Sequence, residues 1–390
     1  MALHPRVHVL YPTSFWGKGP PETCYRICSH WPSQGLSVEV HAAACLREDP
    51  ARIMAPALPA VLPKRLQRRL AGNLRLVGFL KRRSVALALA AIRPGDVCYC
   101  WPGAPIAAIA AARAKGARIV LEFINTHVAY AKDILDAECD RIGAPHYPQF
   151  TTETLDHEAA RLALADAVFA PGPFVEDSIR ATTAKVPQIL PASYGTYLPT
   201  DPPRGHPDHD AGRPLRFLFV GSVGLRKGAH TLMEAWRRAA LPAELWIAGA
   251  VEPLLATQEM RQKFLGTLPE TVRFLGHVSD IGEVYRAADV FVFPSLEEGG
   301  PQVTYEAAAY GLPLIVTPMG AGYIARDGAN ALVVAPSDAD AMAEALTRLH
   351  ASETLRLALG AQALRDVEDY AWERVADRRR RALSDFAAEP

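Results

Sequence analysis

Short apolar runs alternate with longer helix-period stretches along almost the whole chain of 390 residues. The runs predicted to be strands are Val7–Tyr11, Val38–Ala42, Val97–Trp101, Ile119–Phe123 and Val168–Ala170 in the first half, and Leu215–Val220, Glu244–Ala248, Val272–Phe274, Val290–Phe293, Leu314–Val316 and Leu332–Val334 in the second. The helices predicted between them include Glu22–Trp31, Ala104–Ala112, His230–Ala240 and Ile281–Ala287. Strands that are apolar on both faces are covered on both sides, and strand–helix alternation implies parallel pairing. The predicted fold class is therefore α/β, with doubly wound, Rossmann-like parallel sheets.

One segment interrupts this alternation. Tyr197–Pro214 is crowded with proline, glycine and charged residues, which is typical of an exposed linker. We therefore expect a domain over residues 1–196, a linker over 197–214 and a second domain over 215–372. Ligands of such sheets bind at the carboxyl ends of the strands, so the cleft between the domains is the expected site.

Composition excludes several classes of protein. The formal net charge is zero, which argues against a dedicated nucleic-acid binder. The six cysteines have no Cys-x-x-Cys spacing of a zinc site, and free core thiols favour a reducing cytoplasm. The first residues lack the features of a signal peptide, and no apolar stretch reaches about 18 residues. We expect a cytoplasmic protein without a spanning helix.

The stretch from Lys64 to Arg83 differs in charge from the rest of the chain. Between Asp49 and Asp96 there is no acidic residue, yet eight cations cluster there with leucines interleaved. A basic amphipathic surface of this kind can bind anionic lipid headgroups on the inner face of a membrane. The alternative is a solvated helix face whose acidic counterparts lie elsewhere in the fold.

The strongest chemical signal lies around Glu298. A buried strand ends at Phe293, a glycine-rich turn follows, and Pro301 is expected to occupy the first position of a helix. The exposed amides and the helix dipole then form an anion site suited to phosphate, built from Gly299, Gly300, Pro301, Gln302 and Val303. Glu306 lies two helical turns after Glu298 and could hold the two hydroxyls of a ribose. A single glutamate here would be explained as a helix-end charge, but the strand, turn, proline and spacing coincide.

A second signal follows the first strand of the second domain. Phe219–Gly228 combines a strand end, several glycines and the adjacent cations Arg226 and Lys227. Such a loop can hold a diphosphate, with Lys227 as a point charge and Arg226 as a planar fork. The alternative is a surface pair at a helix start, which the helix dipole disfavours.

At these residues the chain resembles glycosyltransferase family 4, which has two facing domains in the GT-B fold. The family carries Glu-x7-Glu in a context similar to Pro294-Ser295-Leu296-Glu297-Glu298-Gly299-Gly300-Pro301 and Glu306-Ala307. The resemblance implies that Glu298 contacts the donor sugar, that Glu306 contacts the ribose, and that Lys227 neutralises the leaving diphosphate. Gly300 stands where an aromatic residue is frequent, Gln302 where asparagine is common, and Ser222 where an arginine is frequent.

The resemblance extends to weaker positions. His277 and Val278 match the family's base-binding segment, and the closing helix, about residues 373–390, is expected to pack back on the first domain. Gly17 and Gly19 occupy the place of the family's glycine loop, although a mere tight turn explains them as well. His127 follows a strand where the family often has a histidine that contacts the donor sugar; a hydrogen-bonded loop histidine is the alternative. Glu158 is interpreted as structural.

The resemblance predicts a retaining, metal-independent glycosyltransferase that uses a UDP or GDP sugar and no further cofactor. The acceptor would be a glycan, a lipid-linked sugar or a small molecule, as in the synthesis of surface polysaccharides or glycoconjugates. Asp208-His209-Asp210 looks like a metal-binding Asp-x-Asp, but it lies in the predicted linker rather than after a strand. The rival hypotheses are a non-catalytic nucleotide-sugar-binding scaffold and a sugar-nucleotide epimerase on the same fold.

Overall fold

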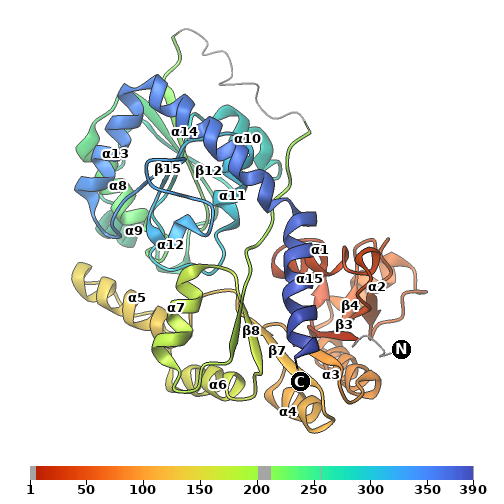
Figure 1. Ribbon diagram of the computed structural model, residues 1–390. Coiled ribbons are helices and arrows are strands. Elements are labelled where there is room, and N and C mark those ends of the chain that lie inside the picture. Colours follow the sequence, from red (N-terminus) through yellow and green to blue (C-terminus); the bar gives the residue numbers. More distant parts are fainter. Residues whose placement is uncertain (1–5, 201–211, 256, 390) are drawn as a thin grey trace.

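The computed structural model describes residues 6–200, 212–255 and 257–389, and it contains two large parallel sheets (Figure 1). The first sheet has the strand order β5-β3-β1-β6-β7-β8-β9. Its strands are β1 (Val7–Leu10), β3 (Val38–Ala42), β5 (Met54–Pro56), β6 (Val97–Cys100), β7 (Arg118–Glu122), β8 (Ala167–Ala170) and β9 (Gln188–Pro191). A separate pair joins β2 (Ser14–Phe15) to β4 (Ala44–Cys45). Every pairing in both is parallel.

The second sheet has the order β12-β11-β10-β13-β14-β15 and is also parallel throughout. Its strands are β10 (Leu215–Val220), β11 (Ala243–Ala248), β12 (Val272–Gly276), β13 (Val290–Phe293), β14 (Leu314–Val316) and β15 (Ala331–Val333). The prediction of two doubly wound parallel sheets is therefore confirmed. Because β10 pairs with β13, the loops that follow these two strands lie side by side.

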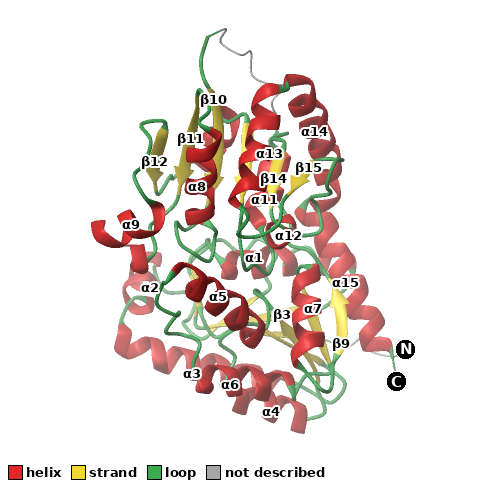
Figure 2. Cartoon of the chain, turned by 90° about the vertical axis from the view of Figure 1, so that its left-hand side faces the viewer, coloured by secondary structure: helices red, strands yellow, loops and turns green. Residues whose placement is uncertain are grey.

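Helices alternate with the strands in both halves. Those of the first half are α1 (Pro20–Cys28), α2 (Lys64–Ala71), α3 (Leu74–Ala91), α4 (Ile106–Ala114), α5 (Val128–Ile142), α6 (Thr152–Leu162) and α7 (Pro173–Thr182). Those of the second are α8 (Ala229–Ala239), α9 (Gln258–Leu265), α10 (Ile281–Ala287), α11 (Gln302–Ala309), α12 (Pro318–Ala321), α13 (Ala339–Ala351), α14 (Glu353–Asp366) and α15 (Trp372–Ala388). Figure 2 shows α5 and α7 between the two sheets, at the side of the first that faces the second. Within the described part of the chain, no helix is long and apolar enough to cross a membrane.

The sequence prediction missed the two edge strands of the first sheet. β5 and β9 each end on a proline, at Pro56 and Pro191. A proline lacks the N–H that an inner strand needs, so it breaks the strand pattern in the sequence while an edge strand tolerates it.

The first predicted helix is also displaced, since α1 begins at Pro20 and ends at Cys28. Prolines at the first helical positions lose no hydrogen bond, which explains the earlier start.

The last helix leaves the second half of the chain and packs on the first sheet (Figure 1). Helix α15 contributes four buried side chains to the hydrophobic core that also includes residues of β1, β3 and β6: Trp372, Ala376, Leu383 and Phe386. Arg379 forms an ion pair of 2.9 Å with Glu122 at the end of β7, and both side chains are fully buried. Because removing one partner of a buried ion pair leaves an uncompensated charge, this contact fixes α15 in place.

Of the predicted linker, residues 201–211, including Asp208, His209 and Asp210, lie outside the described residues.

Candidate active site between the two sheets

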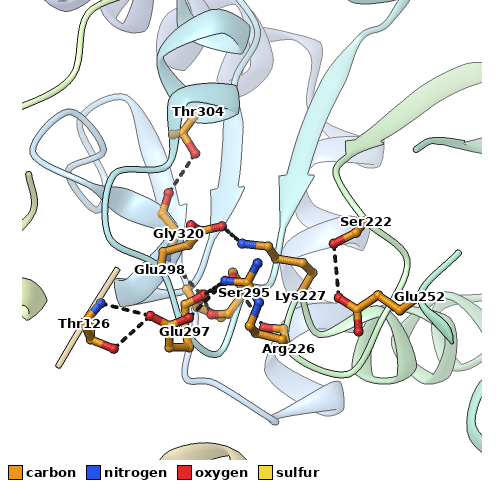
Figure 3. A network of polar contacts seen from close by, with 11 residues as sticks. Thr126, Ser222, Arg226, Lys227, Glu252, Ser295, Glu297, Glu298, Thr304 and Gly320 are labelled. Carbon is orange, nitrogen blue, oxygen red and sulfur yellow. Dashed lines mark hydrogen bonds and ion pairs between the residues drawn. The ribbon is translucent and has the colours of Figure 1, made fainter. Parts of the chain in front are cut away.

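Two loops that follow neighbouring strands of the second sheet meet here, and each leads into a helix. Lys227 precedes Gly228, the N-cap of α8, and Glu298 lies in the loop between β13 and α11. The Nζ of Lys227 is in direct contact with Oε1 of Glu298, and both side chains are buried (Figure 3). Residues 71 apart in sequence are thus joined because β10 and β13 are neighbours in the sheet.

Burial governs the charges at this contact. Desolvation lowers the pKa of Lys227, while the carboxylate of Glu298 opposes that shift. Desolvation also opposes the charge of Arg226, but the carboxylates of Glu298 and Glu297 outweigh it and raise the pKa of Arg226. Two cations therefore sit close together in a largely water-excluded place, where their field on a bound anion is strong.

Glu297, which the sequence analysis did not single out, links the two halves of the molecule. Its Oε1 accepts hydrogen bonds from the amide and hydroxyl of Thr126, at 3.0 and 2.8 Å, and its Oε2 pairs with Nη1 of Arg226 at 2.9 Å (Figure 3). Thr126 follows β7 of the first sheet. The guanidinium of Arg226 is thus directed to Glu297 rather than sharing a partner with Lys227.

Tyr147, in the loop after α5, makes a second connection. Its hydroxyl accepts from the amide of Arg226 at 2.9 Å and donates to Glu252 at 3.3 Å. Ser222 donates to the other oxygen of Glu252 at 3.1 Å. Ser222 therefore supplies no cation, and Glu252 adds a negative charge beside the loop that we expected to hold a diphosphate.

The glycines of the turn lie tightly against the first half of the chain. A Cβ on Gly299 would lie 2.1 Å from the carbonyl oxygen of Ile124, and one on Gly300 would lie 2.5 Å from Cδ2 of Tyr194. No side chain fits at distances below 3.0 Å unless its surroundings move. The ring of Tyr194 thus fills the space beside Gly300, which explains a glycine where the resembling family often has an aromatic residue.

The start of α11 differs slightly from the prediction. Pro301 is the N-cap, and the helix begins at Gln302. The amide of Gln302 donates to the carbonyl of Gly300 at 2.8 Å, so it is already used within the chain. Val303 is half-buried and packs against the hydrophobic core around the second sheet. Of the amides expected to bind an anion, that of Gln302 is therefore not free in this conformation.

Glu306 lines a cavity of about 270 Å³ between the two halves of the molecule. It accepts a hydrogen bond of 2.9 Å from Tyr285, whose ring stacks on Tyr310 at 5.3 Å between centroids. Burial raises the pKa of Glu306, and the bond from Tyr285 only partly offsets this shift. A carboxylate with one hydrogen-bond partner at a cavity wall can accept further bonds from a ligand.

The glycine loop of the first half reaches the same cavity. Gly19 lines it together with Glu306, Gln302 and the stacked tyrosines. Gly19 is the N-cap of α1 with a φ of 66°, and Gly17 has a φ of 81°, conformations that favour glycine. The structure therefore brings together Gly19, Gln302 and Glu306, and places Gly17 two residues earlier in the same turn.

His127 lines neither this cavity nor the contact between Lys227 and Glu298. It is the N-cap of α5, where its Nδ1 accepts from the amide of Ala129 at 3.2 Å, and its own amide donates to Ser178 at 2.8 Å. Its side chain lines a different cavity, beside α6 and the end of α7. The Nδ1 lone pair of His127 is thus occupied by capping α5, so the contact of this histidine with the donor sugar stays a prediction.

His277 and Val278 follow β12, the edge strand of the second sheet. His277 is exposed, and Val278 is half-buried against the second core. They lie at the same carboxyl edge as the loops that carry Lys227 and Glu298, but they line none of the cavities described here.

A third cavity, of about 430 Å³, lies beside Arg226 and Glu297. Glu158 of α6 forms part of its wall, and burial raises the pKa of Glu158 to about 7 even though the amide of Val128 donates to its carboxylate. Arg161 lies there too, with buried guanidinium nitrogens that have no hydrogen-bond partner. Little in the local sequence distinguishes these residues, because α6 has the pattern of an ordinary helix.

Comparisons with known proteins show similarity to glycosyltransferases. The sequence model of a family described as Glycosyl transferases group 1 matches residues 214–352. The capsular polysaccharide biosynthesis glycosyltransferase CapM of Staphylococcus aureus is 31% identical over 155 residues, which are 39% of this chain and 40% of CapM. The lipopolysaccharide core biosynthesis glycosyltransferase LpsE of Rhizobium meliloti is 37% identical over 144 residues, 36% of this chain and 41% of LpsE. The matched part thus spans about two-fifths of these relatives.

The similarity of the folded chain extends further than that of the sequence. Sucrose-phosphate synthase from Thermosynechococcus elongatus superposes with a TM-score of 0.70, covering 99% of this chain and all of that one, at 21% identity. Identity at this level shows the fold alone. Both sheets, and not only the second, therefore share the arrangement of the GT-B fold.

Proposed function

We propose that this chain, whose residues 214–352 match the model of the family described as Glycosyl transferases group 1, transfers a sugar from a nucleoside-diphosphate donor to an acceptor. The observation that carries the proposal is the contact between Lys227 and Glu298 at two adjacent helix starts, with Glu306 on the wall of the cavity between the sheets. We further propose that the donor is a UDP or GDP sugar and that the anomeric configuration is retained.

The proposed mechanism assigns a separate task to each charge. Breaking the glycosyl–phosphate bond develops negative charge on the leaving diphosphate, and a preorganised cation placed there stabilises the transition state. The diphosphate would replace Glu298 as the partner of Lys227. Glu298 would then be free to accept hydrogen bonds from sugar hydroxyls, while Glu306 accepts from the ribose.

Donor entry requires the two halves to separate slightly. Gly299 and Gly300 touch Ile124 and Tyr194, and Lys227 has little exposed surface. We therefore propose that the donor binds to an opened form and that closure then excludes water from the reacting bond.

The test is a panel of UDP and GDP sugars, each offered with and without glycan and lipid-linked acceptors. Release of nucleoside diphosphate that depends on an acceptor supports transfer. Tight donor binding without release would instead indicate a non-catalytic scaffold, and conversion of the sugar without an acceptor would indicate an epimerase. The anomeric configuration of the product, measured by NMR, decides whether the reaction retains or inverts.

We also propose that α2 and α3 dock on an anionic membrane surface, which would bring a lipid-linked acceptor to the cleft. The eight cations are Lys64, Arg65, Arg68, Arg69, Arg75, Lys81, Arg82 and Arg83; all are exposed, and no described carboxylate pairs with them. Leu74 is 90% exposed and Phe79 49%, beside this charge. Anionic lipid favours such a surface by about 1 kcal/mol per cation near it.

Co-sedimentation with vesicles tests this docking. We expect binding to vesicles that contain phosphatidylglycerol, little binding to pure phosphatidylcholine, and a strong loss for Arg82→Gln/Arg83→Gln. Arg348→Gln, an exposed arginine of α13, is the matched control and should bind as the wild type does. Equal binding by wild type and the double variant would refute the docking without affecting the proposed transfer reaction.

A further inference from the structure

A cluster of metal-ligating side chains lies on one face of the first sheet, apart from the cavities described above. His8 comes from β1, and Glu39 and His41 come from the adjacent strand β3. Residues two apart on a strand point to the same face, so Glu39 and His41 lie together, and the register pairs His8 with Glu39. Both imidazoles are buried, whereas the side chain of Glu39 is 47% exposed.

The three potential ligand atoms form a nearly regular triangle. Nδ1 of His8 lies 3.2 Å from Nε2 of His41, and Oε2 of Glu39 lies 3.7 Å from the former and 3.5 Å from the latter. A tetrahedral zinc ion with bonds of about 2.0–2.2 Å holds its ligand atoms about 3.3–3.5 Å apart. The triangle thus matches one face of a zinc coordination tetrahedron without rearrangement of the backbone.

A fourth residue orients the first histidine. Nε2 of His8 lies 3.3 Å from Oδ2 of Asp96, and Asp96 is itself held by the amides of Arg6 and Arg93 at 3.2 and 2.8 Å. A carboxylate that accepts the Nε2 proton leaves the Nδ1 of His8 with a lone pair that can bind a metal ion. Carboxylate–histidine–zinc sets of this kind fix the ring and raise its basicity as a ligand.

We propose that His8, His41 and Glu39 bind one Zn²⁺ ion, with Asp96 as the orienting group behind His8 and the fourth position open to water. Two imidazoles and one carboxylate are a ligand set suited to zinc rather than to magnesium or calcium, which prefer oxygen. His8 is the second residue of β1, and the cleft lies beyond the carboxyl ends of the strands. The ion therefore joins β1 to β3 and takes no part in the sugar transfer.

The competing explanation is a plain hydrogen bond between two neutral imidazoles, in which His41 donates to His8. It accounts for the distance of 3.2 Å and for the role of Asp96, but it gives no part to Glu39. The two explanations differ in what happens when zinc is added, and in the effect of changing Glu39.

The experiment is isothermal titration of the chelator-treated full-length chain with Zn²⁺, repeated with Mg²⁺, and a visible spectrum after addition of Co²⁺. We expect one equivalent of bound Zn²⁺, no binding of Mg²⁺, a tetrahedral Co²⁺ spectrum and a rise in Tm with Zn²⁺, because a ligand that binds only the folded state stabilises it. Asp96→Asn should weaken the zinc affinity about 10- to 100-fold.

Glu39→Ala is the decisive variant, because this half-exposed side chain can be removed without opening the core. It should lose most of the zinc affinity and the Co²⁺ spectrum while keeping the Tm of the metal-free wild type. His209→Asn is the control for binding outside the cluster, since Asp208-His209-Asp210 could also hold a metal. Absence of stoichiometric binding, or zinc affinity that is unchanged in Glu39→Ala, overturns the proposal; donor turnover measured in parallel keeps this result separate from the proposed function.

Discussion

The two ends of the interface between the sheets are built differently. Around Lys227, three residues of the first half form hydrogen bonds with residues of the second half: Thr126 with Glu297, Tyr147 with the amide of Arg226, and Glu138 with His230. Around Glu306, residues of both halves face a cavity, and among the described residues α1 and α11 form no hydrogen bond with each other. The end expected to hold the diphosphate is thus closed, and the end expected to hold the nucleoside is open.

This difference indicates an order of events. A donor can place its nucleoside in the open cavity beside Glu306 first, but its diphosphate has to displace existing contacts around Lys227. The binding energy of the nucleoside would then offset the cost of separating those contacts. The predictions below test the closed end, the open end and the connections between the two halves.

The largest effect is expected at the closed end. Lys227→Ala and Glu298→Ala should each lower the rate of transfer at least about a hundredfold, because each removes a contact made to the developing charge or to the sugar. The measurement is kcat for acceptor-dependent release of nucleoside diphosphate. Lys185→Ala, an exposed lysine outside the interface, is the control and should retain full activity. Rates near that of wild type in either active-site variant contradict the assigned roles.

The next largest effect concerns Glu138 of α5. It binds His230 of α8, Arg141, and Ser337 at 2.9 Å. Although burial acts to raise it, the pKa of Glu138 is lowered to about 2 by the bonds from Arg141 and His230. A lowered pKa contributes stability that is complete above the unfolded pKa near 4.5 and is lost as the pH falls toward 2.

Glu138→Gln should therefore lower the free energy of unfolding on the order of 2 kcal/mol at pH 7. The difference from wild type should persist down to about pH 5 and shrink below pH 4.5. Urea unfolding followed across this range measures both values. A difference that is constant down to pH 3 would show that the charge of Glu138 does not hold the two halves together.

At the open end, Glu306→Gln should weaken donor binding about tenfold, because a carboxylate accepts from hydroxyls more strongly than an amide does. It should also raise Tm at neutral pH. Burial raises the pKa of Glu306, so the folded state binds this proton more tightly than the unfolded state does. The protonated carboxyl therefore contributes stability at low pH, and this stability is lost as the pH rises through the folded pKa. KM for the donor and Tm at pH 4 and 7 give the readouts; a lower Tm at pH 7 contradicts this explanation.

The smallest effect is expected for Tyr147→Phe. It removes one hydroxyl that accepts from the Arg226 amide and donates to Glu252, contacts worth about 1 kcal/mol together. Because these contacts hold the closed end in the absence of donor, the variant should bind nucleoside diphosphate a few-fold more tightly. Phe150→Leu, which removes the neighbouring ring rather than the hydroxyl, is the comparison. Weaker binding by Tyr147→Phe would show that the hydroxyl helps the donor instead.

Much of the second sheet could be predicted from the sequence because its inner strands, such as β10, β13 and β14, are predominantly apolar. β10, β13 and β14 have the predicted bounds, whereas the proline-containing edge strands β5 and β9 were missed. For the site, the spacing of Glu298 and Glu306 and the position of Lys227 carried the signal. Glu297 carried none of its own, because nothing local distinguishes one glutamate of a pair from the other.

The sequence by itself determined the parallel α/β sheets and predicted a cation loop and a Glu-x7-Glu segment at two helix starts, since these follow from local periodicity and from turn chemistry. Only the tertiary structure decided that Tyr194 fills the space beside Gly300, that His127 caps α5, and that His8, Glu39 and His41 converge. Such contacts depend on the packing of segments far apart along the chain, and no local pattern encodes which face a side chain meets across such a distance.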